Sequence, residues 1–445
     1  MRRFSRLLNL QTPRLDDRHL RDFVRTFLVR RDQFLAVAEA EGTPLYVFDR
    51  SGLVDKARRF RQAFSEVLPD FRAYYAVKSN SYPQIGQTLL GEGFGLDVSS
   101  GLELQLALGL NADDIIFSGP GKSPDELRLA AHHADRVTVL IDSFAELEKL
   151  EAVAAECNIV MRAGVRLTTE DSGIWRKFGI PLARLDEFLG RAGGCGHVDL
   201  SGLQFHLSWN LDPSAQVSFI ERLGAVMRRL EPQHRKHIRF LDIGGGFWPE
   251  EGEWLQAEAT SLGQIRSILW EKPAGRRKHY FRAARPIRDF AGRIAEALDR
   301  HLPGDMRPTI CMEPGRWLCH DAMHILLTVA DRKSSDVVIT DGGTNAVGWE
   351  RFESDYFPVI NLTRPGLDEH DCLVSGSLCT PHDLWGYSFF GDDIKEGDVL
   401  LVPDQGAYTY SLRQQFIKPL PACAELPPDG AERTTGRQSR ESMTR

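Results

Sequence analysis

The sequence predicts an α/β fold in which a TIM-like (β/α)8 barrel is followed by a C-terminal β-rich domain. Eight short β-rich runs recur between residues 71 and 318, and most of them are separated by charged, helix-like segments. This alternation is typical of a parallel sheet with helices outside it. From about residue 320 the pattern changes to short strands with turn residues.

The eight predicted strands lie at regular intervals along the chain. They are 71–80, 93–100, 114–120, 136–143, 158–167, 200–209, 238–247 and 308–318. The segments between them include two amphipathic stretches, SPDELRLAAHHA at 123–134 and SFAELEKLEAVAAE at 143–156, which predict helices. A doubly wound open sheet is the structural alternative, but eight strands in one series favour the closed barrel.

The pattern divides the chain into five parts. Residues 1–42 predict a charged helical extension, and 43–50 contains a short strand that we expect to join the β-rich domain. The barrel is predicted over 51–318 and the β-rich domain over 319–424. The polar segment 425–445 has little apolar content, so we expect it to be disordered.

Composition narrows the class of protein. The chain has 445 residues, 42% of them hydrophobic and 26% charged, with a net charge of −7, which predicts a soluble globular protein and argues against nucleic-acid binding. No apolar run approaches the roughly 20 residues that cross a bilayer. The seven cysteines are scattered and form no C-x-x-C pair, which argues against a metal site and favours a reducing, cytoplasmic location.

Unusual polar groups stand at the ends of the predicted strands, which meet at one rim of a barrel. They are Lys78, Asp97, Arg166, His206, Gly244, Gly245, Gly246, Glu313 and Arg316. Each has a structural explanation when taken singly: a solvated lysine, a core histidine, a tight glycine turn, a local ion pair in EPGR. Their convergence on one rim is the stronger observation, and it predicts a functional site.

The chemistry of these groups suits one cofactor. A lysine can form a Schiff base with an aldehyde. Glycine-rich backbone and an arginine can bind a phosphate. A carboxylate can keep a pyridine nitrogen protonated, and an imidazole can stack on an aromatic ring. Together these are the needs of pyridoxal 5'-phosphate (PLP).

With these motifs the chain resembles the fold-type III PLP-dependent decarboxylases, the group of ornithine, arginine and diaminopimelate decarboxylases with an alanine racemase-like barrel. The resemblance runs from about residue 43 to 416. In YYAVKSN it implies that Lys78 is the Schiff-base residue, and in GLQFHLSWN that His206 covers the cofactor ring. LDIGGGF would bind the phosphate through Gly244–Gly246. EPGR would place Glu313 at the pyridine nitrogen and Arg316 near the phosphate.

The resemblance also assigns residues that the strand pattern does not reveal. GSLCTPHDLWG is similar to the family's cysteine motif and implies roles for Cys379 and Asp383. GAYTYS implies that Tyr408 reaches the phosphate, and VRLTTEDS that Arg166 lies near the ring hydroxyl. In the family the cysteine motif enters the partner's site. A homodimer with shared active sites is therefore implied, in which Cys379 protonates the α-carbon.

Departures from the family pattern bear on the substrate. Thr380 stands where many members have an acidic residue, which suits a substrate with a neutral or anionic distal group. Asp355 is kept at a position where some members hold a distal amine. The CTPxD pattern resembles a branch that acts on modified or carrier-linked amino acids. The expected activity is that of a PLP-dependent carboxy-lyase in amino-acid biosynthesis, acting on an amino acid or its derivative.

Two alternatives remain open at this stage. One is an amino-acid racemase of the same fold, a branch that typically lacks a carboxylate partner for the ring nitrogen, so Glu313 argues against it. The other is a catalytically silent PLP-binding or partner-binding protein. Inactive relatives usually lose the lysine or the cysteine, and this chain keeps both Lys78 and Cys379.

Overall fold

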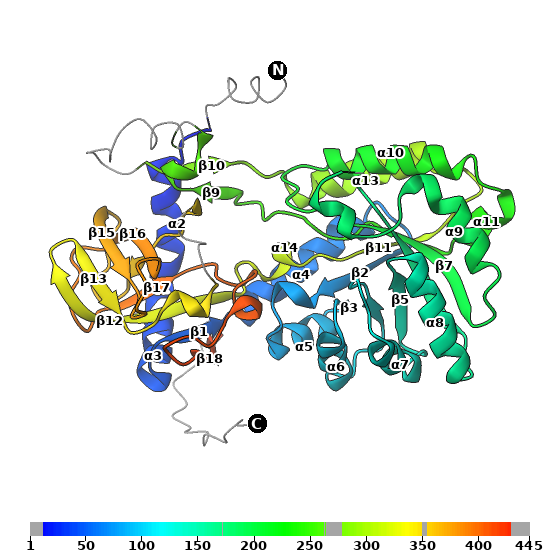
Figure 1. Ribbon diagram of the computed structural model, residues 1–445. Coiled ribbons are helices and arrows are strands. Elements are labelled where there is room, and N and C mark those ends of the chain that lie inside the picture. Colours follow the sequence, from blue (N-terminus) through cyan, green and yellow to red (C-terminus); the bar gives the residue numbers. More distant parts are fainter. Residues whose placement is uncertain (1–11, 171, 262, 264–277, 349–353, 429–445) are drawn as a thin grey trace.

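The computed structural model describes residues 12–170, 172–261, 263, 278–348 and 354–428. Two bodies stand side by side, a barrel and a β-rich domain (Figure 1). The first residues of the predicted extension, 1–11, and most of the predicted tail, 429–445, lie outside the described residues. Among those described, no helix has the length and apolar character needed to span a membrane.

Eight parallel strands close the barrel in the order β11-β2-β3-β4-β5-β6-β7-β8. Their bounds are β2 (Phe71–Ala76), β3 (Gly95–Val98), β4 (Ile115–Phe117), β5 (Val137–Ile141), β6 (Met161–Leu167), β7 (Val198–Phe205), β8 (Phe240–Asp242) and β11 (Thr309–Met312). Seven of them lie within the predicted runs, and β7 begins two residues before its run, 200–209. The closed barrel is confirmed, and the open sheet is wrong because β11 pairs with both β8 and β2.

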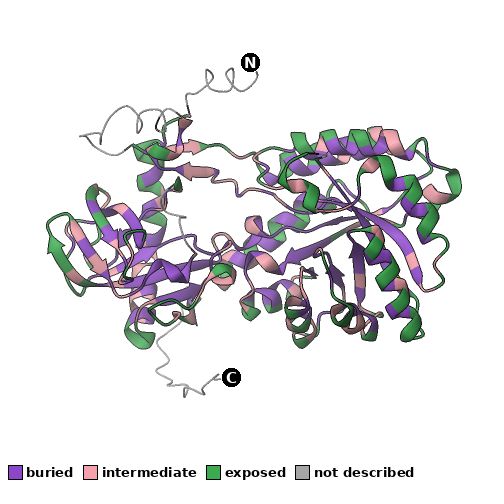
Figure 2. Ribbon diagram, viewed as in Figure 1, coloured by how far each residue is buried: buried purple, intermediate pink, exposed green. Residues whose placement is uncertain are grey.

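Helices surround the barrel with their apolar faces inward and their charged faces in solvent (Figure 2). They are α4 (Arg50–Ser65), α5 (Pro83–Gly91), α6 (Gly101–Gly109), α7 (Pro124–His132), α8 (Phe144–Glu156), α9 (Leu185–Ala192), α10 (Ser214–Met227), α11 (Pro232–His237), α13 (Ile287–His301) and α14 (Arg316–Cys319). Serines cap the N-termini of three of these helices. Ser100, Ser123 and Ser143 each accept a hydrogen bond from the third helical backbone N–H, which satisfies a donor that the helix leaves unpaired.

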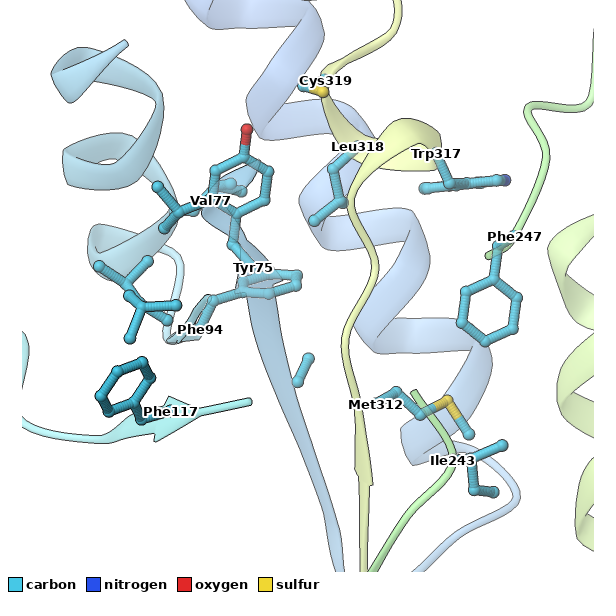
Figure 3. Packing of buried hydrophobic residues seen from close by; sticks show 14 of the residues in the cluster. Tyr75, Val77, Phe94, Phe117, Ile243, Phe247, Met312, Trp317, Leu318 and Cys319 are labelled. Carbon is cyan, nitrogen blue, oxygen red and sulfur yellow. The ribbon is translucent and has the colours of Figure 1, made fainter. Parts of the chain in front are cut away.

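Aromatic packing outside the barrel positions two of the rim loops. Phe60 of α4 is fully buried, and its ring lies 5.5 Å from that of Phe247 and 5.6 Å from that of Trp317. Phe247 directly follows the glycine loop, and Trp317 directly follows Arg316 (Figure 3). The packing of α4 therefore fixes both segments at the rim.

Removing the Phe60 ring should destabilise this arrangement. Phe60→Ala leaves a cavity between α4 and the two rim segments, so the free energy of unfolding should fall by about 3–5 kcal/mol. Urea denaturation measures the change. Leu102, which is 79% exposed on α6, provides the control, and Leu102→Ala should change the free energy by less than about 0.5 kcal/mol. Equal stability of the two variants would contradict this account of the packing.

The β-rich domain contains an eight-stranded sheet in the order β13-β15-β16-β14-β17-β12-β1-β18. The strands are β1 (Leu45–Phe48), β12 (Met323–Ser334), β13 (Val337–Thr340), β14 (Ile360–Asn361), β15 (Glu369–Ser375), β16 (Leu384–Phe390), β17 (Val399–Val402) and β18 (Ala422–Glu425). The early strand β1 is buried throughout, antiparallel to β12 and parallel to β18. Residue 425, where the predicted tail starts, is thus the last residue of a strand.

The N-terminal helices α2 (Asp17–Val29) and α3 (Arg31–Glu41) pack along the β-rich domain (Figure 1). Leu20, Val24 and Phe27, at helical spacing, share a core cluster with Leu326 and Leu401 of the sheet. The amphipathic face of α2 explains why these charged residues form a helix that stays attached.

A two-stranded hairpin that the sequence did not predict joins the barrel to α2. β9 (Glu253–Leu255) and β10 (Tyr280–Arg282) pair antiparallel and reach from the barrel towards α2 (Figure 1). The Trp254 ring lies 4.8 Å from that of Phe23 on α2. The hairpin thereby forms one wall of a hollow beside the barrel rim.

Candidate active site

Lys78 lies just beyond the end of β2, in the short 3₁₀ helix η1 (Val77–Ser79). The turn is held from both sides, because the Ser79 hydroxyl donates to the Ala76 carbonyl at 2.7 Å and the Asn80 amide donates to the Gly406 carbonyl at 2.7 Å. Lys78 Nζ donates to Asp97 Oδ2 at 2.8 Å, and the side chain remains 31% exposed. The amine is therefore oriented by a carboxylate yet accessible to a ligand.

Charges around Lys78 hold it as a cation in the protein alone. Burial acts to lower the pKa of Lys78, but the charges of Asp97 and Glu313 outweigh it and raise the pKa above its usual range. Burial and the charge of Glu313 raise the pKa of Asp97, against the opposing effects of Lys78 and Ser118. Asp97, which accepts the hydrogen bond from Nζ, is in contact with the proton that Lys78 must lose to become neutral.

Glu313 follows β11 and is buried among polar partners. Gln204 of β7 donates its amide to Glu313 Oε1 at 3.2 Å, and His206 Nδ1 lies 3.5 Å from Oε2. The Gly245 backbone N–H donates to His206 Nδ1 at 3.2 Å, so we assign the ring proton to Nε2. Burial lowers the pKa of His206, which agrees with a neutral ring.

The carboxyl groups beneath this rim differ in protonation. Burial acts to raise the pKa of Glu313, but the positive charges of Lys78 and Arg166 hold it below its usual range. Burial and the charge of Glu313 raise the pKa of Asp242 well above its usual range. Glu313 is therefore the anion and Asp242 the neutral acid. An anion at this position can pair with a cationic ring nitrogen.

The glycine loop after β8 leaves no room for side chains. A Cβ at Gly245 would lie 2.1 Å from the Glu313 carbonyl oxygen, and one at Gly246 would lie 1.8 Å from the Leu207 carbonyl oxygen. Gly246 also has a φ of +79°, which side-chain-bearing residues rarely adopt. The loop thus brings bare backbone against the His206 and Glu313 segments, as a phosphate-binding turn requires.

Two arginines and a tyrosine complete the rim. The Arg316 guanidinium lies 4.5 Å from the centre of the Trp248 ring and 5.0 Å from that of Tyr408. The Tyr408 N–H donates to the Ser79 carbonyl at 2.7 Å, which ties this segment to the lysine turn. Arg166 donates to the Ser118 carbonyl at 3.5 Å and lies 4.4 Å from the Phe178 ring.

The structure therefore brings together the rim residues that the sequence predicted, and the set fits PLP. The Lys78 amine faces the Asp97 carboxylate, and the flat, neutral His206 ring lies beside the ionised Glu313. The glycine loop has no room for a Cβ, so its backbone is open to a phosphate. Sequence reasoning missed Gln204 and Asp242. Gln204 lies on β7 two positions before His206, which directly follows the strand, and this spacing of two could have found it.

The four residues predicted to meet the substrate are placed differently. Asp355 lines a hollow together with Arg316 and Tyr408. Cys379 is exposed and Thr380 half-buried on the loop between β15 and β16, and among the described residues no hydrogen bond joins Cys379 to the barrel. Asp383 is buried instead, accepting hydrogen bonds from the backbones of Thr344 and Leu378 at 2.7 and 2.6 Å.

Comparison with known proteins agrees with this geometry. The family model "Pyridoxal-dependent decarboxylase, pyridoxal binding domain" matches residues 51–320. Diaminopimelate decarboxylase of Methanothermobacter thermautotrophicus is 29% identical over 405 residues, covering 87% of each chain. L-glutamyl-[BtrI acyl-carrier protein] decarboxylase of Niallia circulans is 25% identical over 404 residues, covering 85% of this chain and 87% of that one.

Solved structures show the same fold. Diaminopimelate decarboxylase from M. jannaschii in complex with L-lysine superposes with a TM-score of 0.72, at 23% identity, and covers 88% of this chain and 89% of that one. Lysine/ornithine decarboxylase from Vibrio vulnificus complexed with cadaverine gives 0.70 at 23% identity and covers 89% and 96%. With the family match over more than half of its length, the chain belongs to the pyridoxal-dependent decarboxylases and is a PLP-dependent amino-acid carboxy-lyase.

Proposed function

We propose that the protein decarboxylates an α-amino acid with PLP, which Lys78 would hold until the substrate amine displaces it, with Glu313, His206 and the glycine loop binding the cofactor. When bound, PLP withdraws electrons from the substrate's α-carbon as carbon dioxide leaves. The observation that supports this best is the position of Lys78 and Glu313. They follow the neighbouring strands β2 and β11, with the Asp97 carboxylate 2.8 Å from the lysine amine.

In this proposal Asp97 accepts the proton that Lys78 loses. The lysine must lose a proton before its nitrogen can attack a carbonyl carbon. Asp97 is in direct contact with Nζ and has a raised pKa, so a proton can pass to it over 2.8 Å. The hydroxyl of Ser118, which donates to the other oxygen of Asp97, keeps that carboxylate oriented.

In this proposal Glu313 and His206 position the cofactor ring. The ionised Glu313 favours a protonated pyridine nitrogen, which makes the ring a stronger electron acceptor. Gln204 fixes one oxygen of Glu313, and Gly245 fixes the neutral His206 ring for stacking. We assign Arg316 and Tyr408 to the phosphate, as the resemblance implies.

Glu313→Gln tests the electron-acceptor role. The substitution keeps the shape of the side chain but removes the anion, so kcat should fall by about 10²–10³-fold while PLP remains bound. Steady-state carbon dioxide release and the cofactor absorbance band measure the two effects separately. Glu187→Gln removes an exposed carboxylate that pairs with Arg184 and should leave kcat unchanged. An unaltered kcat in Glu313→Gln would refute the role.

We propose that the chain works as a homodimer in which Cys379 of the partner subunit returns a proton to the α-carbon. In its own chain Cys379 is exposed on the β-rich domain. Asp383 supports this loop by accepting hydrogen bonds from Leu378 and Thr344, so its part is to present the cysteine rather than to contact substrate. Thr380, next to the cysteine, would then face the substrate's distal group.

The substrate we propose is a diamino acid of the diaminopimelate type or an acylated or carrier-linked amino acid. Similar proteins include diaminopimelate decarboxylases and a decarboxylase named for a carrier-linked glutamyl substrate. Asp355 lines the hollow beside Tyr408 and could hold an amine, whereas Thr380 offers no charge to one. A distal group that offers an amine to Asp355 and a neutral or anionic part to Thr380 meets both conditions.

A carbon dioxide release screen tests the substrate class. It should cover lysine, ornithine, meso-diaminopimelate, N-acylated diamino acids and carrier-linked amino acids. We expect kcat/KM for meso-diaminopimelate, an N-acylated diamino acid or a carrier-linked amino acid to exceed that for ornithine by at least about tenfold. This factor corresponds to the charge-assisted contact that ornithine lacks at Thr380. A preference for ornithine would contradict the role given to Thr380.

A further inference from the structure

A second hollow lies between α2, the β9–β10 hairpin and the barrel rim, and we call it the α2 pocket. Its walls and floor include Phe23, Trp248, Glu251, Trp254, Tyr356 and Asp404. Four of these six side chains are aromatic. The Trp254 ring lies 4.8 Å from that of Phe23 and 6.3 Å from that of Tyr356, so the rings form a continuous wall.

The floor of the α2 pocket carries more acid than base. Glu251 and Asp404 line it, and Asp321 lies behind them. Lys56 Nζ lies 3.2 Å from Asp321 and 3.6 Å from Glu251, and Arg316 also lines the pocket. Three carboxyl groups thus share one ammonium group.

Hydrogen bonds do not satisfy all the oxygens of these carboxyl groups. Within the described part of the chain, one oxygen of each carboxyl group is buried without a hydrogen-bond partner: Glu251 Oε2, Asp321 Oδ1 and Asp404 Oδ1. Asp404 is only 7% exposed and lines the pocket. Buried polar oxygens without partners are costly, so such a floor favours a positively charged ligand.

Two of these acids have raised pKa values in the protein alone. Burial raises the pKa of Asp404 well above its usual range, and the charges of Asp321 and Glu251 add to the effect. Lys56 opposes the rise, Asp49 adds to it, and His324 packs 3.9 Å from the Asp404 carboxyl. Burial likewise raises the pKa of Asp321 to about 6. Asp404 and Asp321 therefore bind protons more readily than exposed aspartates when no further cation is near them.

We propose that the α2 pocket binds an organic ammonium ion, with the aromatic wall on its alkyl groups and Glu251 and Asp404 at its charge. Aromatic faces and carboxylates together are the chemistry that recognises such ions. A metal ion suits the pocket less well, because no cluster of three His, Cys, Asp or Glu side chains in the described residues could ligate one. Decarboxylation of an amino acid produces an amine, so the pocket would bind this chemical class beside the site that forms it.

The proposal does not depend on which amino acid the enzyme decarboxylates. The pocket adjoins the proposed active site at Arg316 and Asp355, which both line it, but Glu251, Asp404 and three of its rings lie outside the groups assigned to PLP or to the substrate. A probe that cannot react with the PLP aldehyde therefore separates the two sites.

Choline is such a probe, because it has no N–H and forms no Schiff base. Its neutral isostere, 3,3-dimethylbutan-1-ol, differs in the charge. Calorimetric titration of the PLP-loaded enzyme should show one choline bound per chain, at least about tenfold tighter than the alcohol, because only the cation gains from the carboxylates. The cofactor absorbance band should not change. Equal affinity for the two probes, no binding of choline, or a cofactor spectrum that changes with choline would overturn the proposal.

Three variants locate the binding. Glu251→Gln and Phe23→Ala should each weaken choline binding by at least about fivefold, through loss of the anion and of the wall respectively. Glu250→Gln removes the adjacent carboxylate, which pairs with Arg59 outside the pocket at 2.6 Å, and should leave the affinity unchanged. Phe23→Ala alters no charge, so it tests the pocket even if loss of Glu251 disturbs Lys56. Unchanged affinity in both pocket variants would refute the assignment.

Discussion

Lys78→Ala should abolish turnover while leaving the barrel folded. The variant removes the nitrogen that attaches the cofactor, so kcat/KM for carbon dioxide release should fall by at least about a thousandfold. The fold should survive, because Lys78 is 31% exposed and the Ser79 and Asn80 hydrogen bonds hold the turn without it. Thermal unfolding, followed by circular dichroism, checks the second part.

Two further measurements separate a lost function from a lost fold. Lys149 is an exposed lysine on α8, and Lys149→Ala should keep full activity. Added ethylamine should restore part of the activity of Lys78→Ala, because a small amine can enter the space that the side chain vacates. Retained activity in Lys78→Ala would show that another lysine attaches the cofactor.

Mixing two inactive variants should restore about a quarter of the wild-type activity. In a Lys78→Ala and Cys379→Ala heterodimer, one site carries both lesions and the other carries neither. Random assortment makes about half of the dimers mixed, and each of these has one intact site of two, by the symmetry of a two-fold interface. The prediction follows if Lys78 of one chain works with Cys379 of the partner subunit.

The experiment requires unfolding and refolding the variants together, then assaying carbon dioxide release. Each variant refolded alone provides the baseline, and Cys379→Ala alone should still bind PLP. Cys372→Ala removes a buried cysteine of the same domain and provides the control. Mixing it with Lys78→Ala should give no more activity than Cys372→Ala supplies by itself. Activity no higher than the two parents would refute the shared site.

The barrel could be predicted from the sequence because each of its strands is buried on both faces. Runs such as RVTVLIDS carry that signal within a few residues, and the caps at Ser123 and Ser143 mark the following helices locally. The rim residues followed from the same rule, since the ends of parallel strands meet at one edge. The lysine of AYYAVKSN stands at its strand end for that reason.

The hairpin and the polar network could not be predicted in the same way. β9 and β10 are three residues each, are separated by 24 residues, and gain their stability from Phe23 on a distant helix. Asp242 carries no local sign that its carboxyl is buried against Glu313. Asp383 was predicted to meet substrate, but only the fold shows both of its oxygens engaged with its own domain.

The measurement that tests the account most directly is the attachment site of the cofactor. Borohydride reduction of the PLP-loaded enzyme fixes the cofactor to its lysine, and peptide mass mapping identifies the residue. The account predicts a pyridoxyl group on Lys78, in the segment AYYAVKSN, with the other lysines unlabelled. A label on any other lysine would contradict the assignment of this rim as the active site.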